Sequence, residues 1–148
     1  MDPPGGGDPR MDGMTGVSSC LPVVPSADLE RSLRLWREGL GFDVTWYEER
    51  RAGRLVGCGI GNGRIRVLLN IRQGDPRKPA DYEGVRFYWA PDDLVALHAR
   101  LRDLGYAVSE IEERYYGQAE FVMTDDDGFD HCFGVPAGDL KASDDGER

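Results

Sequence analysis

Two segments of the chain place apolar residues at the spacing of an amphipathic helix. The first begins after Ser26, which we predict as its N-cap, and ends at Gly41, a residue suited to a left-handed helix stop. Its apolar stripe consists of Leu29, Leu33, Trp36 and Leu40. The second begins near Asp92 or Asp93 and ends at Gly105. Its stripe consists of Leu94, Leu97, Leu101 and Leu104.

Segments rich in β-branched and aromatic residues surround both helices, and each is predicted to be a strand. In the first half they are Ser19–Val24, Phe42–Glu49, Arg54–Ile60 and Arg64–Ile71. In the second half they are Val85–Trp89, Tyr106–Ile111, Ala119–Thr124 and Phe129–Phe133. The pairs Asn62–Gly63 and Asp127–Gly128 are typical of tight hairpin turns. Each half therefore has the order strand, helix, three strands.

The two halves also match each other in sequence. Three anchors recur at an offset of 64 or 65 residues: Asp28-Leu29 with Asp93-Leu94, Leu40-Gly41-Phe42 with Leu104-Gly105-Tyr106, and Asn62-Gly63 with Asp127-Gly128. A four-stranded sheet with a single helix leaves one face of the sheet uncovered. We therefore predict an α+β fold in which two tandem βαβββ modules form one curved mixed-sheet trough, with the helices outside.

Composition shifts mark the expected boundaries of the domain. We predict a single domain over residues 17–136, with modules at about residues 17–74 and 84–136. Asp75–Glu83 is interpreted as a linker. Glycine, proline and aspartate dominate residues 1–16, which favours a disordered leader over a signal peptide, and residues 137–148 are interpreted as a flexible acidic tail. No apolar run reaches the roughly 20 residues that a membrane span needs.

Charge and cysteine content restrict the partners and the compartment. The net charge of −9 over 148 residues opposes binding to a phosphate backbone, so no nucleic-acid partner is expected. The same charge either attracts a cationic ligand or serves solubility alone. The chain has three cysteines, Cys20, Cys58 and Cys132, and no two of them have the close spacing of a metal site. An odd number of cysteines favours reduced thiols and a cytoplasmic location.

The segments that carry the repeat resemble a known family. The run from Leu21 to Leu33, followed by Gly39-Leu-Gly-Phe, is similar to the opening of glyoxalase/bleomycin-resistance/dioxygenase proteins, the vicinal oxygen chelate superfamily. Residues 116–121 and 125–128 resemble the closing motif of these proteins, YGxREFxxxDPDG. Ala119 replaces the arginine of that motif, and Asp126 replaces its proline. The missing arginine removes a charged group near the mouth of the expected pocket.

The resemblance identifies the positions at which metal-using members carry His or Glu. Two of these positions lie seven residues before the helix starts at Asp28 and Asp93, and two lie four residues after the turn glycines Gly63 and Gly128. The residues at these positions are Leu21, Arg86, Val67 and Cys132. A divalent metal needs several imidazole or anionic ligands, whereas two of these residues are aliphatic and one is a permanent cation. We therefore expect no metal and no cofactor. His98 is interpreted as a surface residue, and His131 is expected on the face opposite to Cys132.

Strand alternation predicts which side chains line the trough. Residues two positions apart on a strand share a face, so Tyr88 faces the trough if Arg86 does, and Asp130 faces it if Cys132 does. In the same way, Leu69 faces the trough if Val67 does. Other aromatic residues of the chain lie on segments that border the trough in the family that the chain resembles, where they could stack on a ligand. The expected ligand-binding set is Leu21, Trp46, Tyr47, Val67, Leu69, Arg86, Tyr88, Tyr115, Tyr116, Asp130 and Cys132.

Two kinds of function remain open. The first is a metal-independent binding protein of the bleomycin-resistance type, a homodimer that sequesters an antibiotic or aromatic metabolite. The alternative is a metal-independent enzyme of the same fold, with Arg86, Tyr88, Asp130 or Cys132 as candidate catalytic residues. Pairing of Arg86 with Asp130 would make the pocket suit a cationic or neutral ligand. An unpaired Arg86 would favour a carboxylate, phenolate or enolate and would strengthen the enzyme hypothesis.

Overall fold

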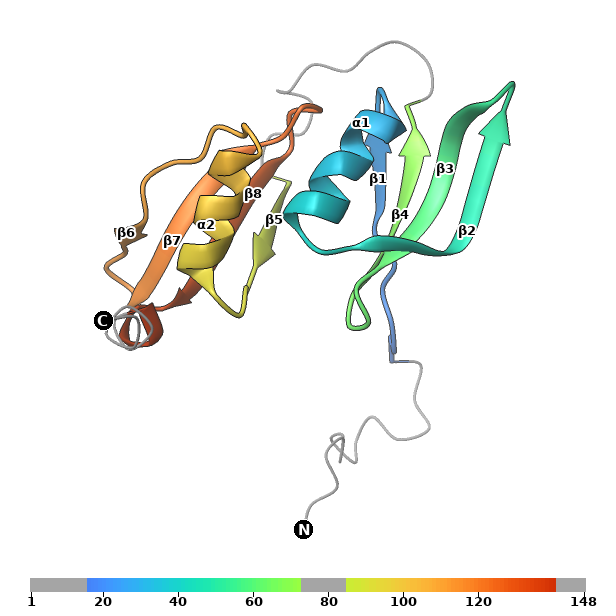
Figure 1. Cartoon of the computed structure of the whole chain (residues 1–148). Helices are drawn as coiled ribbons and strands as arrows, with labels where there is room; N and C mark the ends of the chain where they lie inside the picture. Colours follow the sequence, from blue (N-terminus) through green and yellow to red (C-terminus); the bar gives the residue numbers. More distant parts are fainter. Residues whose placement is uncertain (1–15, 73–84, 141–148) are drawn as a thin grey trace.

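The computed structural model describes residues 16–72 and 85–140 of the chain. The first module consists of β1 (Val23–Ser26), α1 (Leu29–Arg34), a π-helical turn η2 (Leu35–Gly39), β2 (Asp43–Arg51), β3 (Arg54–Gly61) and β4 (Arg66–Ile71). The second consists of β5 (Arg86–Trp89), α2 (Leu94–Asp103), β6 (Glu112–Glu113), β7 (Gln118–Thr124) and β8 (Asp130–Pro136). Both modules have the predicted order of strand, helix and three strands (Figure 1).

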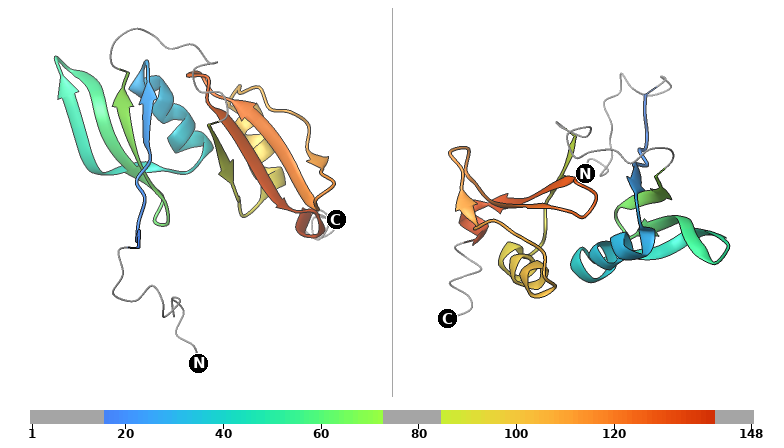
Figure 2. Two further views of the ribbon diagram at one scale, coloured as in Figure 1. Left: turned by 180° about the vertical axis from the view of Figure 1, so that it is seen from behind. Right: turned by 90° about the horizontal axis from the view of Figure 1, so that it is seen from above.

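The strands form two four-stranded sheets of the same topology, β1-β4-β3-β2 and β5-β8-β7-β6. In each sheet the first strand of the module runs parallel to the last, and the other pairs are antiparallel. Both helices cover the same side of the molecule, and the view from behind shows sheets without a helix over them (Figure 2). We call this uncovered side of each sheet its open face. The predicted α+β fold of two tandem βαβββ modules is confirmed.

Local sequence determines where the helices begin and end. Asp28 and Asp93 are the N-caps, and each side chain accepts a hydrogen bond from the backbone N–H three residues further on. The prediction of Ser26 as N-cap is wrong, because Ser26 is still part of β1. Gly41 and Gly105 end the helices as predicted, with φ angles of +79° and +97° that favour glycine.

Each module has a core between its helix and its sheet, and Trp36 joins the two cores. The Trp36 ring packs against Phe42 of its own module, and its centroid lies 5.9 Å from those of Phe87 and Trp89 in the second module. Leu35, also from the first module, belongs to the core of the second. The η2 turn thus places two side chains that hold the modules together.

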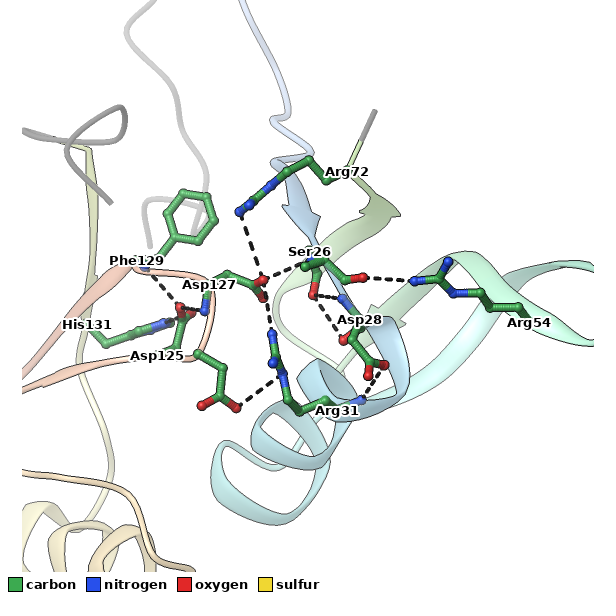
Figure 3. Close-up of polar contacts among 11 residues, drawn as sticks. Ser26, Asp28, Arg31, Arg54, Arg72, Asp125, Asp127, Phe129 and His131 are labelled. Carbon is green, nitrogen blue, oxygen red and sulfur yellow. Dashed lines mark hydrogen bonds and ion pairs between the residues drawn. The ribbon is translucent and has the colours of Figure 1, made fainter. Parts of the chain in front are cut away.

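The turn between β7 and β8 contacts the start of α1 across the module boundary (Figure 3). Asp127 accepts a hydrogen bond from the backbone N–H of Ala27 at 2.9 Å and lies 3.5 Å from the Arg31 guanidinium. Asp125 stabilises the turn, because its side chain accepts hydrogen bonds from the backbone N–H groups of Asp127 and Phe129. Its other carboxylate oxygen lies 2.8 Å from Nε2 of His131. The acidic run at 125–127 therefore organises the junction between the modules.

Some segments differ from their predicted extents. The strand predicted at Tyr106–Ile111 is reduced to one bridge, between Val108 and Met123, and is followed by the short β6. Residues 137–140, assigned to the tail from sequence, are helical, and Ala137 and Leu140 pack against the second core. The predicted linker at Asp75–Glu83, residues 1–15 of the predicted leader and residues 141–148 of the tail lie outside the described residues.

Candidate functional site: a groove on the second module

The open face of the second sheet carries a groove of about 450 Å³. Its walls come from β5, β7, β8 and the segment before β7: Arg86, Tyr88, Arg114, Tyr115, Tyr116, Glu120, Val122, Thr124, Asp130, His131 and Cys132. Alternation along β5 explains which of its residues line the groove, because Phe87 and Trp89 pack toward the core while Arg86 and Tyr88 point to the opposite face. We call this cavity the groove. It contains six of the residues expected from sequence to bind a ligand, namely Arg86, Tyr88, Tyr115, Tyr116, Asp130 and Cys132.

Arg86 and Asp130 lie opposite each other on neighbouring strands but do not form an ion pair. They are register partners on β5 and β8. Asp130 instead accepts a hydrogen bond from the Thr124 hydroxyl at 2.7 Å. Within residues 16–72 and 85–140, the Arg86 side chain has neither a hydrogen bond nor an ion pair. The structure therefore selects the unpaired alternative, in which a guanidinium group is free to bind an acidic ligand.

The sequence did not point to Glu120, a further charged group of the groove. Its side chain is buried, Oε1 accepts a hydrogen bond from the Tyr116 hydroxyl at 2.6 Å, and Arg114 Nε lies 3.5 Å from the same oxygen. Alternation along β7 provides the signal that could have found it. Phe121 and Met123 belong to the core, so Glu120 must face the other way.

Cys132 lines the groove but is poorly suited to nucleophilic catalysis. Burial raises the pKa of its thiol, and the nearby Glu120 carboxylate raises it further. Arg86 acts in the opposite direction and lowers the pKa of the thiol, but its influence is smaller. Because the thiolate is the reactive form, a raised pKa lowers reactivity at neutral pH. His131 lies on the core side of β8 and accepts a hydrogen bond from the Trp89 indole at 3.0 Å through Nδ1.

The open face of the first module carries the other predicted aromatic residues. A β-bulge between Val44 and Tyr47 lets Trp46 and Tyr47, which are neighbours in sequence, both lie over the open face of β3. Trp46 covers Gly59, and the Arg66 guanidinium lies 3.9 Å from its ring centroid. Leu21 precedes β1 and is exposed. These residues lie on a different sheet from the groove, so within one chain the structure does not gather all predicted residues into one pocket.

The prediction that Val67 and Leu69 face the trough is wrong. Both are buried in the core beneath α1. The turn between β3 and β4 has four residues, whereas the turn between β7 and β8 has five, so the repeat offset changes across the turn. A shift of one residue reverses the face of every side chain in a strand. Leu68, not Val67, corresponds to Cys132, because it pairs with β1 as Cys132 pairs with β5.

No group of three or more His, Cys, Asp or Glu side chains that could hold a metal occurs among the described residues. His98 is half-buried, and its Nε2 lies 2.8 Å from the carbonyl oxygen of Ser109. Within the same residues, no helix is both long and apolar enough to cross a membrane.

Comparisons with solved structures give the same fold. TioX from Micromonospora sp. ML1 is 12% identical, with a TM-score of 0.64 over 81% of this chain and 99% of its own. A bleomycin resistance determinant encoded on the transposon Tn5 is 17% identical, with a TM-score of 0.59 over 81% and 98%. TnmS3, an antibiotic binding protein from Streptomyces sp. CB03234, is 24% identical, with a TM-score of 0.61 over 83% and 98%.

No curated protein sequence matches this chain. At the level of sequence families, the match covers most of both modules, from residue 19 to residue 133. The chain therefore belongs to the Glyoxalase/Bleomycin resistance protein/Dioxygenase superfamily.

Proposed function

We propose that this protein binds and sequesters a small aromatic molecule, an antibiotic or a related metabolite, without a metal. The observation that carries the proposal is the groove, whose lining combines the unpaired Arg86 side chain with Tyr88 and Tyr116. Binding sites for small molecules combine apolar walls with a few polar groups that orient the ligand. Bleomycin-resistance and antibiotic-binding proteins among the similar structures add support.

The free guanidinium determines the expected charge of the ligand. A cationic ligand would be repelled at Arg86, whereas a carboxylate, phenolate or enolate would gain a charge-assisted hydrogen bond. We therefore propose an aromatic acid, although the net charge of −9 by itself would attract a cation. At short range the local guanidinium dominates, because salt screens the distant surface charges.

A second copy of the chain is the proposed macromolecular partner. Both open faces carry exposed aromatic side chains, including Trp46 on the first sheet and Tyr88 on the second. A homodimer would bring the open face of one copy against that of another, so that each groove is closed by its partner. We also propose a cytoplasmic location, since reduced thiols such as Cys20 persist there.

An enzyme without a metal is the second candidate, and the unpaired Arg86 favours it. A guanidinium group can stabilise an enolate or phenolate as negative charge develops in a transition state. The raised pKa of Cys132 argues against a covalent thiol mechanism. Stoichiometry distinguishes the two candidates, because a sequestering protein protects one ligand per site whereas an enzyme converts an excess of substrate.

The ligand class can be found by a thermal-shift screen of glycopeptide, enediyne and aromatic polyketide compounds with and without an acidic group. Ligands that bind the native state raise its stability, by about 2.7 kcal/mol at 100 times Kd. Arg86→Met should then weaken an acidic aromatic ligand about tenfold or more, since a hydrogen bond to a charged group is lost. Arg102→Met, which removes an exposed charge from α2, is the matched control. Equal affinity in both variants would contradict the proposal.

A further inference from the structure

A buried carboxylate on β7 contacts two side chains at the rim of the groove. Glu120 lies within β7 and is only 3% exposed. Its Oε1 accepts a hydrogen bond from the Tyr116 hydroxyl at 2.6 Å and lies 3.5 Å from Nε of Arg114. Both partners belong to the turn at residues 114–117, which we call the rim turn. One side chain of the sheet therefore contacts this turn at two points.

The tyrosine side chains of the rim turn are largely exposed. Tyr115 is 100% exposed and Tyr116 is 52% exposed. Backbone hydrogen bonds from Arg114 to Gln118 and from Gly117 to Arg114 close the turn, but they do not set the orientation of the rings. An exposed side chain changes rotamer rapidly, and ordering it on binding costs affinity. A hydrogen bond that holds the ring before the ligand arrives removes part of this cost.

The surroundings of Glu120 argue against a role in stabilising the fold. Burial of a carboxylate costs free energy, and an apolar residue in its place often leaves a protein equally or more stable. Such a replacement is harmful when it leaves a partner buried and unpaired. Here Arg114 and Tyr116 are both partly exposed, so water can replace the carboxylate. The third partner, the thiol of Cys132, is only a weak donor.

We propose that Glu120 is a positioning residue, which fixes the Tyr116 ring and the Arg114 guanidinium at the rim of the groove before a ligand arrives. This inference rests on the proposed function, since the positioned groups belong to the same groove and orient the same aromatic acid. Glu120 acts through them and does not touch the ligand. The strand is the rigid element and the rim turn is held against it, which gives an exposed turn the precision that a binding wall needs.

The first test measures stability and affinity in Glu120→Leu, with 2-naphthoate, a fluorescent aromatic acid, as the probe on the full chain. The melting temperature should stay the same or rise, because the buried charge is removed. The affinity for 2-naphthoate should fall about fivefold, since the Tyr116 ring is no longer held in place. Glu113→Gln removes one exposed charge from β6 and is the control, in which neither value should change.

A double-mutant cycle identifies the group through which Glu120 acts. Tyr116→Phe keeps the ring but removes the hydroxyl that binds Oε1. It should weaken 2-naphthoate binding by a similar factor, and the double variant should bind no more weakly than either single variant. Glu120→Gln keeps an oxygen that can accept from Tyr116, so it should retain most of the affinity. Additive losses in the double variant would overturn the assignment.

Hydrogen exchange tests the same contacts without a ligand. The peptide that covers residues 114–118 should exchange faster in Glu120→Leu than in the native protein, because the rim turn loses its contacts with Glu120. The peptide that covers α2 is the internal control and should exchange equally in both proteins. Unchanged exchange of the rim turn would overturn the inference.

The outcomes distinguish this inference from the proposed function. If 2-naphthoate binding is weakened by Arg86→Met but not by Glu120→Leu, the positioning role is wrong and the proposed function stands. A lower melting temperature of Glu120→Leu with unchanged affinity would make Glu120 a structural residue. If 2-naphthoate does not bind the native protein at millimolar concentration, the proposed aromatic acid is contradicted. Exchange at the rim turn then decides by itself whether Glu120 holds the turn.

Discussion

Four positions, three of them on strands and one just before β1, correspond to those that carry metal ligands in the metal-using members that this chain resembles. With the corrected register they are Leu21, Leu68, Arg86 and Cys132. Aliphatic side chains have no lone pairs to offer, and a guanidinium group repels a divalent cation. We predict that EDTA leaves the melting temperature unchanged and that dialysed protein holds far less than one equivalent of zinc, iron, manganese or nickel. Elemental analysis that finds a near-equimolar metal would contradict this prediction.

Cys58 should give the protein a measurable sensitivity to alkaline pH. Burial raises the pKa of this thiol from 9.0 to about 11. Between these values the unfolded chain releases the proton while the folded chain keeps it, so the free energy of unfolding falls as pH rises. Below the lower value the thiol is neutral in both states and the full stability remains. Urea unfolding of Cys58→Ala across this window should show a flatter pH dependence than the native protein, and parallel curves would refute the assignment.

At the level of elements, β3 shows how glycine shapes an open face. Gly57 and Gly59 alternate with Cys58 and Ile60, which are buried beneath α1. The glycine positions on the open face are filled by the rings of Tyr47 and Trp46 from β2. The sequence pattern by itself does not reveal that these glycines are sites of close packing.

Gly59→Ala should displace the Trp46 ring, because a Cβ at that position would overlap the indole. We expect a loss of about 1–3 kcal/mol in the free energy of unfolding, as for other overpacked sites. A change in tryptophan fluorescence should accompany it. Gly138→Ala is the control, since a Cβ there meets no atom within 4 Å. Equal stability of the two variants, measured by urea unfolding, would show that Trp46 does not pack on β3 in solution.

The internal repeat did not predict correctly which side chains of β4 face the core. The hairpin anchors Asn62–Gly63 and Asp127–Gly128 are real turns, and Gly63 and Gly128 have φ angles of +92° and +89°. The anchors do not reveal that one turn is a residue longer than the other. Turn length depends on how the chain closes on itself, and an error of one residue placed Val67 and Leu69 on the wrong face.

For the whole molecule, the arrangement of the modules leaves two sheets uncovered on the same side (Figure 2). Large apolar side chains are exposed there, including Val23, Trp46, Tyr88, Tyr116 and Val122. Monomeric proteins rarely expose large apolar patches, and such patches mark interaction sites. No described segment of the chain covers it.

We predict a homodimer at tens of micromolar in light scattering, with two equivalent ligand sites. Val122→Glu should shift the equilibrium to monomer, because it places a charge within the open face of the second sheet, where Val122 is 42% exposed. Ala107→Glu adds the same charge at an exposed position on the connection between α2 and β6 and should stay dimeric. A native protein that remains monomeric with ligand bound would refute the dimer.

The sequence by itself determined the elements, their order and the faces of β5 and β8, since these follow from local periodicity. Arg86, Tyr88, Asp130 and Cys132 were placed together on that basis, and the structure brings them into one groove. Only the tertiary structure decided which of these groups is free. Thr124, rather than Arg86, binds Asp130, and Tyr116 binds Glu120. Hydrogen-bond partners depend on distances between strands that are far apart in sequence, and residue periodicity carries no information about them.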